Sequence, residues 1–123
     1  MSPRSAAGLL AAGRAALGMA VLAAPEAVTS RWLGEHASHP AVRYLARSLG
    51  ARDLALGVLA LRTLDDPRVA AKVQAACAVA DSVDALATLA VASELPPAGA
   101  VGTVAVAGAA AVGGFYLSRA LAA

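Results

Sequence analysis

Residues 100–117 read AVGTVAVAGAAAVGGFYL, and this stretch carries no charged side chain. A transmembrane helix needs about 20 consecutive apolar residues, so the stretch is close to the length that spans a bilayer. Its glycines and alanines are small enough to let neighbouring helices approach closely in lipid. The stretch therefore predicts a membrane-spanning helix, and Tyr116 and Arg119 are placed to mark its interfacial end.

The composition of the whole chain agrees with a membrane protein. Of its 123 residues, 59% are hydrophobic, yet it contains only one Trp, one Phe and two Tyr. A soluble core of this size normally depends on aromatic and branched side chains, because these bury the most apolar area. We expect a single integral membrane domain over residues 1–123. The alternative is an alanine-rich soluble helical bundle.

Prolines divide the chain into helical stretches, since proline cannot continue a helix but suits its first turn. The breaks fall at Pro25, at Asp65-Asp66-Pro67 and at Pro96-Pro97. The fold class predicted is all-α, a four-transmembrane-helix bundle of antiparallel up-down topology. Its helices are expected over residues 6–24, 41–64, 67–93 and 100–117, with a polar connection over residues 25–40.

The second of these helices is the least apolar, because its first half carries Arg43, Arg47, Arg52 and Asp53. On insertion scales Arg52 and Asp53 together cost roughly 5–7 kcal/mol, whereas each Leu or Val returns only about 0.3–0.6 kcal/mol. The segment would therefore insert poorly alone. Either partner helices compensate its charges, or its first half lies in the membrane interface.

Basic residues predict the orientation, because the surface richer in Lys and Arg faces the cytoplasm. With four spans, eight of the ten basic residues fall near one surface or the other, five against three, and Arg14 and Arg52 lie within helices. The five are Arg4, Arg62, Arg68, Lys72 and Arg119, and the three are Arg31, Arg43 and Arg47. We therefore predict a multi-pass protein of the cell membrane with both termini cytoplasmic. A cleaved signal peptide is disfavoured, because Arg14 interrupts the apolar region that such a peptide needs.

Six ionisable residues within the predicted helices form the candidate site: Arg14, Arg47, Arg52, Asp53, Asp81 and Asp84. Charges inside a bilayer are rare and persist mainly where they are paired or functional. Asp81 and Asp84 are three residues apart, so both carboxylates lie on one helix face. Arg47 and Asp53 share an arc of their helix, whereas Arg52 points nearly the opposite way. Arg14 needs a carboxylate partner.

Two interpretations of the acidic pair remain open. Two carboxylates in a dry site cannot both ionise cheaply, so one tends to keep its proton while an adjacent Arg holds the other as a carboxylate. That arrangement suits a general acid or a proton carrier. Alternatively, the pairs Arg14–Asp81 or Arg47–Asp84 simply neutralise one another and fix the helix register.

These interpretations lead to two function classes. The first is a membrane-embedded acid–base enzyme, a cyclase or isomerase that acts on a hydrophobic small molecule without a cofactor. Asp81 or Asp84 would donate a proton and Asp53 would accept one. The arginines would bind substrate or pair with the acids. The second class is non-enzymatic: a structural subunit, or a proton-coupled transporter that would favour a homodimer because four short helices make a thin pathway.

Other partners have little support in the sequence. Basic residues are scattered and not interleaved with aromatic ones, which argues against nucleic acid. His36 and His39 have no Cys or acid cluster beside them to complete a metal site. The lone Cys77 excludes an internal disulfide and is expected to be a small buried residue.

The elements Gly13-Arg14, Arg47-x-x-Gly50-x-Arg52-Asp53-x-x-x-Gly57 and Asp81-x-x-Asp84-Ala85 resemble those of a known family. This family consists of small actinobacterial four-helix integral membrane proteins of uncharacterised function. The resemblance extends from about residue 13 to residue 117. It implies the same fold and a membrane location, and it supplies no activity.

Overall fold

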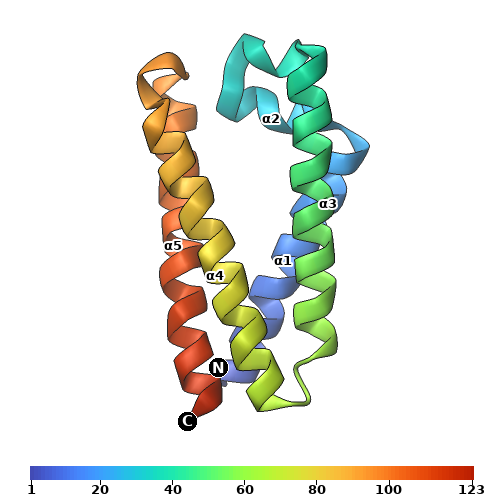
Figure 1. Cartoon of the computed structure of the whole chain (residues 1–123), viewed down its shortest axis with the longest axis vertical. Coiled ribbons are helices and arrows are strands. Elements are labelled where there is room, and N and C mark those ends of the chain that lie inside the picture. Colours follow the sequence, from blue (N-terminus) through green and yellow to red (C-terminus); the bar gives the residue numbers. More distant parts are fainter.

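The computed structural model describes every residue from Met1 to Ala123 and contains helices but no strand. Five α-helices and two 3₁₀ helices follow one another along the chain (Figure 1): α1 (Pro3–Ala23), α2 (Pro25–Leu33), η1 (Gly34–Ser38), α3 (Pro40–Arg62), α4 (Pro67–Ala90), η2 (Ala92–Glu94) and α5 (Pro97–Ala122). The predicted all-α class is confirmed.

Every α-helix begins with a proline at its first position, where the missing N–H costs nothing. Side chains cap three of these starts: the hydroxyl of Ser2 accepts from the N–H of Ser5, His39 Nδ1 from Ala41, and Asp66 from Arg68 and Val69. These starts lie up to three residues before the predicted ones, because the prolines belong to the helices rather than to the connections.

The prediction of a polar connection over residues 25–40 was wrong, because this segment is largely helical. Pro25 opens α2, and the hydroxyl of Thr29 donates to the carbonyl of Pro25 inside that helix. Gly34 ends α2 with a φ of 61°, a left-handed conformation that favours glycine. The chain then continues as η1, so five α-helices replace the predicted four.

The four long helices associate as two pairs. Helix α1 packs along α3, and α4 packs along α5, whereas contacts between the two pairs are few. Helix α2 lies at the end of the molecule away from the chain termini, and both termini lie together at the opposite end (Figure 1). Any interaction between the pairs is therefore important for holding the molecule together.

Glycines let α1 and α3 approach until their backbones touch. A Cβ atom added to Gly57 of α3 would lie 2.6 Å from the backbone nitrogen of Ala15 and 2.8 Å from the carbonyl oxygen of Ala11 in α1. Gly18 and Gly50 meet backbone atoms of the partner helix in the same way. Such close approach through small residues is typical of helix pairs in membranes.

Large apolar side chains lie mainly outside and small ones inside, the reverse of a soluble core. The buried apolar residues are mostly alanines, whereas Leu86, Val101 and Val112 are 66–72% exposed. Three helices, α1, α4 and α5, are long and apolar enough to cross a membrane. The fourth long helix, α3, is not among them, because its charges lower its mean hydropathy.

Replacing Gly57 by alanine tests the α1–α3 contact. The new Cβ would meet backbone atoms that cannot move aside, so we expect a loss of about 1–3 kcal/mol in the free energy of unfolding. Gly108→Ala is the matched control, because an added Cβ there has nothing within 4 Å. Thermal unfolding in detergent measures both variants, and equal stability of the two would contradict the close packing.

Candidate functional site

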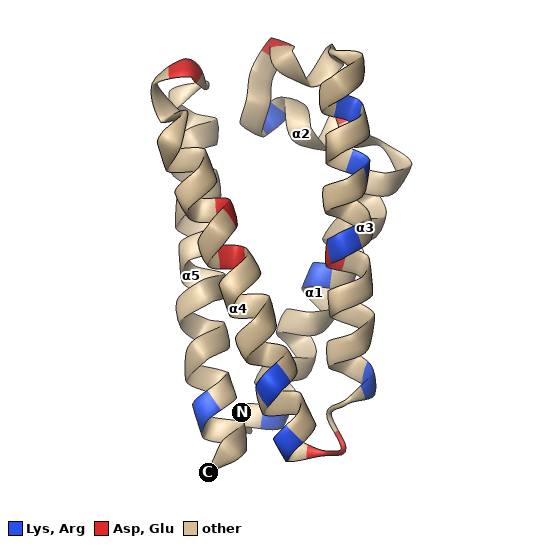
Figure 2. Cartoon of the chain, in the orientation of Figure 1, with Lys and Arg blue, Asp and Glu red and all other residues tan.

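Five of the six predicted site residues meet between the two helix pairs. Arg14 of α1 forms an ion pair with Asp81 of α4. Arg52 of α3 binds Asp84 of α4 through two contacts, Nη2 to Oδ2 at 2.6 Å and Nη1 to Oδ1 at 3.0 Å. Asp53 completes this ion-pair network, and Figure 2 shows the acidic segments of α4 on the side that faces α1 and α3.

Asp53 receives both arginines and so links them. Its Oδ1 lies 3.4 Å from Arg14 Nη1 and 3.0 Å from Arg52 Nη2. Arg14, Asp53 and Asp81 are each at most 9% exposed, whereas Arg52 and Asp84 are partly exposed. Burying charges is unfavourable unless they are paired and hydrogen-bonded, which the network achieves.

The network contains more negative than positive groups. Three carboxylates face two guanidiniums, so its formal charge is −1 when all five residues are ionised. Both oxygens of Asp84 accept hydrogen bonds from Arg52. By contrast, Asp53 Oδ2 and Asp81 Oδ1 accept none, and neither atom is fully enclosed. These two oxygens are the free acceptors of the site.

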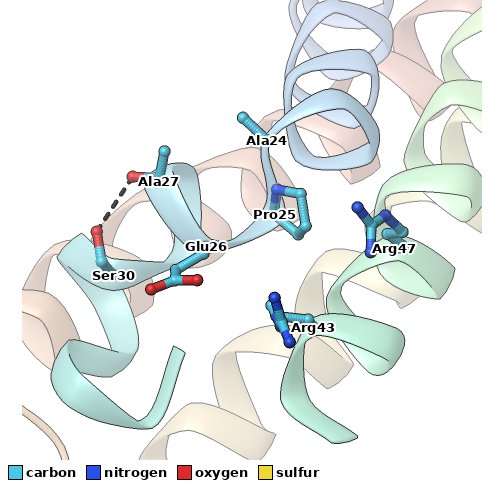
Figure 3. A pocket seen from close by; sticks show the side chains of 7 residues that line it. All are labelled: Ala24, Pro25, Glu26, Ala27, Ser30, Arg43 and Arg47. Atoms are coloured by element: carbon cyan, nitrogen blue, oxygen red, sulfur yellow. Dashed lines mark hydrogen bonds between the residues drawn. The ribbon is translucent and has the colours of Figure 1, made fainter. Parts of the chain in front are cut away.

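Arg47 does not belong to the network, so of the two pairs considered from the sequence, Arg14–Asp81 forms and Arg47–Asp84 does not. The side chain of Arg47 is exposed and makes no ion pair. Together with Arg43 it lines a separate pocket of about 530 Å³ between the start of α2 and α3 (Figure 3). Arg52 takes its place, because a long guanidinium side chain reaches around the helix surface to the acid of the neighbouring helix.

A cleft of about 650 Å³ opens between the helix pairs and ends on the network. Arg14, Asp53, Asp81 and Asp84 form its polar wall, whereas Arg52 does not line it. The remaining walls, from α1, α2, α3 and α5, are mainly apolar. A mainly apolar cavity with a few convergent polar groups is the usual form of a small-molecule site.

Two glycines and one tryptophan shape this cleft, and sequence patterns gave no signal for them. Gly13 of α1 and Gly102 of α5 line it, and a Cβ added to either would meet nothing within 4 Å. Their missing side chains leave room in the cleft. Trp32 of α2 also lines it, and its Nε1 is buried without a hydrogen-bond partner.

Neither family models nor curated proteins nor solved structures yield a match to this chain. The resemblance to small actinobacterial membrane proteins therefore stays a prediction. The site has to be interpreted from its own geometry: a helical protein with three helices able to cross a membrane and a buried arginine–aspartate network beside a cleft.

The unequal charge count predicts unequal effects of removing an acid or a base. Asp81→Asn leaves two carboxylates for two guanidiniums, and Arg14 keeps Asp53, so we expect a loss of about 1–2 kcal/mol in stability. Arg14→Gln leaves three carboxylates for one guanidinium and should cost about 3–5 kcal/mol. Chemical or thermal unfolding in detergent measures both.

The matched control for Arg14→Gln is Arg47→Gln, which removes an exposed, unpaired guanidinium from the same chain and should leave the stability unchanged. If Asp81→Asn lowered the stability as much as Arg14→Gln, Asp53 and Asp81 could not be sharing a surplus of negative charge. The geometry of the network would then be wrong.

Proposed function

We propose that the chain is a four-span helical protein of the cell membrane, with α3 as the span that its hydropathy alone does not reveal. Helix α3 is 23 residues long and lies along α1, which is apolar enough to cross. Its two mid-helix charges, Arg52 and Asp53, are matched by Arg14 and Asp84. Partner helices thus supply the compensation that insertion of this segment requires.

The orientation proposed has both termini in the cytoplasm. The two termini lie at one end of the molecule, and most basic residues outside the cleft gather at this end (Figure 2). The positive-inside bias then places this end on the cytoplasmic side. The proposed resemblance to the actinobacterial four-helix family agrees with a four-span membrane protein.

We further propose that the protein is an acid–base enzyme, an isomerase or cyclase, acting on a hydrophobic small molecule. The observation that carries this proposal is the cleft of about 650 Å³, whose apolar walls end on three carboxylates. Charged groups act strongly on a reacting molecule where water is excluded. A lipophilic substrate can enter such a cleft from the bilayer.

The roles of the acids follow from their hydrogen bonds. Asp84 is held by two nitrogens of the Arg52 guanidinium and therefore positions Arg52. Asp81 and Asp53 each keep one free oxygen beside the cleft. One proton on either would neutralise the network. Asp81 would then donate a proton to one atom of the substrate, and Asp53 would remove a proton from another.

A non-enzymatic function is the second candidate, and one observation favours it. Both arginines are already fully engaged in joining the helix pairs, so the network is complete as a purely structural device. A structural subunit would need only these ion pairs and no ligand in the cleft. A proton-coupled dimeric transporter would instead use the surplus carboxylate to carry a proton.

An isomerase or cyclase produces a compound with the elemental composition of its substrate, so a change in the ratio of two isomers reveals the activity before either compound is identified. Lipophilic extracts are compared between a host strain lacking the protein and the same strain carrying the wild type or Asp81→Asn. We expect two species of equal mass and different retention time, whose ratio changes with the wild type and stays as in the deletion strain with Asp81→Asn.

Two glycine variants on one helix provide the controls. Gly102→Leu places a side chain in the cleft and should abolish the change, whereas Gly108→Leu, with equally free space but outside the cleft, should preserve it. Full conversion by an Asp53→Asn, Asp81→Asn double variant would eliminate the acid–base mechanism.

A further inference from the structure

We infer that the ligand of the cleft is a lipophilic cation, a molecule with an apolar body and one positively charged group such as an ammonium. This inference rests on the proposed function, because it assigns a ligand class to the same cleft. It follows from how charge is distributed over the cleft wall rather than from the cleft's size.

The network side chains that line the cleft carry more negative charge than the network as a whole. Of the two network guanidiniums only Arg14 lines the cleft, while all three carboxylates do, because Arg52 reaches Asp84 from outside the lined space. Electrostatic interactions are strong in a poorly hydrated site. When neither Asp53 nor Asp81 carries a proton, a positive group beside them would cancel the surplus negative charge.

Arg31 is the other cationic residue that lines the cleft, and it does not reverse this balance. Counting it, the lining holds two guanidiniums and three carboxylates, a formal charge of −1. Arg31 lies on α2 with an exposed side chain, where water screens its charge. The carboxylates are buried or partly buried and keep most of their effect.

The free acceptors fit the same class of ligand. Asp53 Oδ2 and Asp81 Oδ1 accept no hydrogen bond from the protein and are open to a donor. An ammonium offers such donors and a positive charge together. An anionic headgroup would face like charges, and a purely apolar ligand would leave both oxygens without a donor.

Trp32 gives the cleft an aromatic wall and a reporter. Trp32 lines the cleft from α2, and aromatic side chains attract cations. It is the only tryptophan of the chain, so intrinsic fluorescence excited at the indole band comes from this position alone. Ligand entry can therefore be followed on the full-length protein without a label.

Two probes of nearly equal size and opposite charge, tetraphenylphosphonium and tetraphenylborate, test the inference. Each is titrated against the full-length wild type in vesicles of phosphatidylcholine, which add no tryptophan, while Trp32 fluorescence is recorded. We expect saturable quenching by tetraphenylphosphonium and an affinity for tetraphenylborate that is lower by at least about tenfold. Equal affinities, or a preference for the borate, would overturn the inference.

Variants separate the cleft from the surrounding lipid. Gly102→Leu should remove saturable quenching and Gly108→Leu should retain it. Asp81→Asn and Asp53→Asn should each weaken tetraphenylphosphonium binding by about tenfold, whereas Arg47→Gln should not. Unchanged binding in both aspartate variants, each verified as folded by circular dichroism, would also overturn the inference.

A neutral probe, N-phenyl-1-naphthylamine, distinguishes failure of this inference from failure of the proposed function. If the neutral probe binds saturably and tetraphenylphosphonium does not, the cleft takes hydrophobic molecules but the charge assignment is wrong. If no probe binds, the cleft is not a ligand site, and the enzyme proposal fails with it.

Discussion

Two ion pairs, Arg14–Asp81 and Arg52–Asp84, connect the two halves of this molecule, and the rest of the architecture depends on them. Helices α1 and α3 form one pair and α4 and α5 the other, with few contacts between the pairs. Asp53 receives both arginines and makes the two bridges one network. Without this network, α3 would carry mid-helix charges with no partner, and placing such charges in a bilayer costs free energy.

Small residues make the contacts within each helix pair, and charged side chains make the contacts between the pairs. Within the first pair, Gly18, Gly50 and Gly57 allow backbone contact, and within the second Gly114 lies against Ala78. Between the pairs, charged side chains span a wider separation. Because long side chains rather than backbones meet there, a cleft of about 650 Å³ remains next to the network. The same residues that join the pairs therefore also form the polar wall of the candidate site.

Sequence patterns predicted those features that depend on local spacing. Prolines indicated the helix boundaries, and the three-residue spacing of Asp81 and Asp84 placed both acids on one face. The need of Arg14 for a carboxylate followed from its position within an apolar helix, and Asp81 supplies that carboxylate. Each inference needed only helix periodicity and the high free energy of an isolated buried charge.

Features that depend on how helices meet were not predictable in the same way. A helical projection placed Arg47 on the same arc as Asp53 and Arg52 nearly opposite, because it ignores the reach of a long side chain. The segment of α2 was interpreted as a connection, because its residues are largely polar and show no apolar helical face. Its buried residues include the polar Thr29. The cleft and the place of Trp32 in it arise from the separation of the two pairs, which no single segment encodes.

We propose that α3 crosses the membrane despite its charges, and cysteine labelling tests this directly. Single cysteines on either side of it, Ser38→Cys and Thr63→Cys, are introduced in a Cys77→Ala background and exposed to a membrane-impermeant maleimide. In intact cells we expect labelling of the cysteine at position 38, with position 63 labelled only after the membrane is opened. Labelling of both positions from the same side would contradict it, because α3 would then not cross.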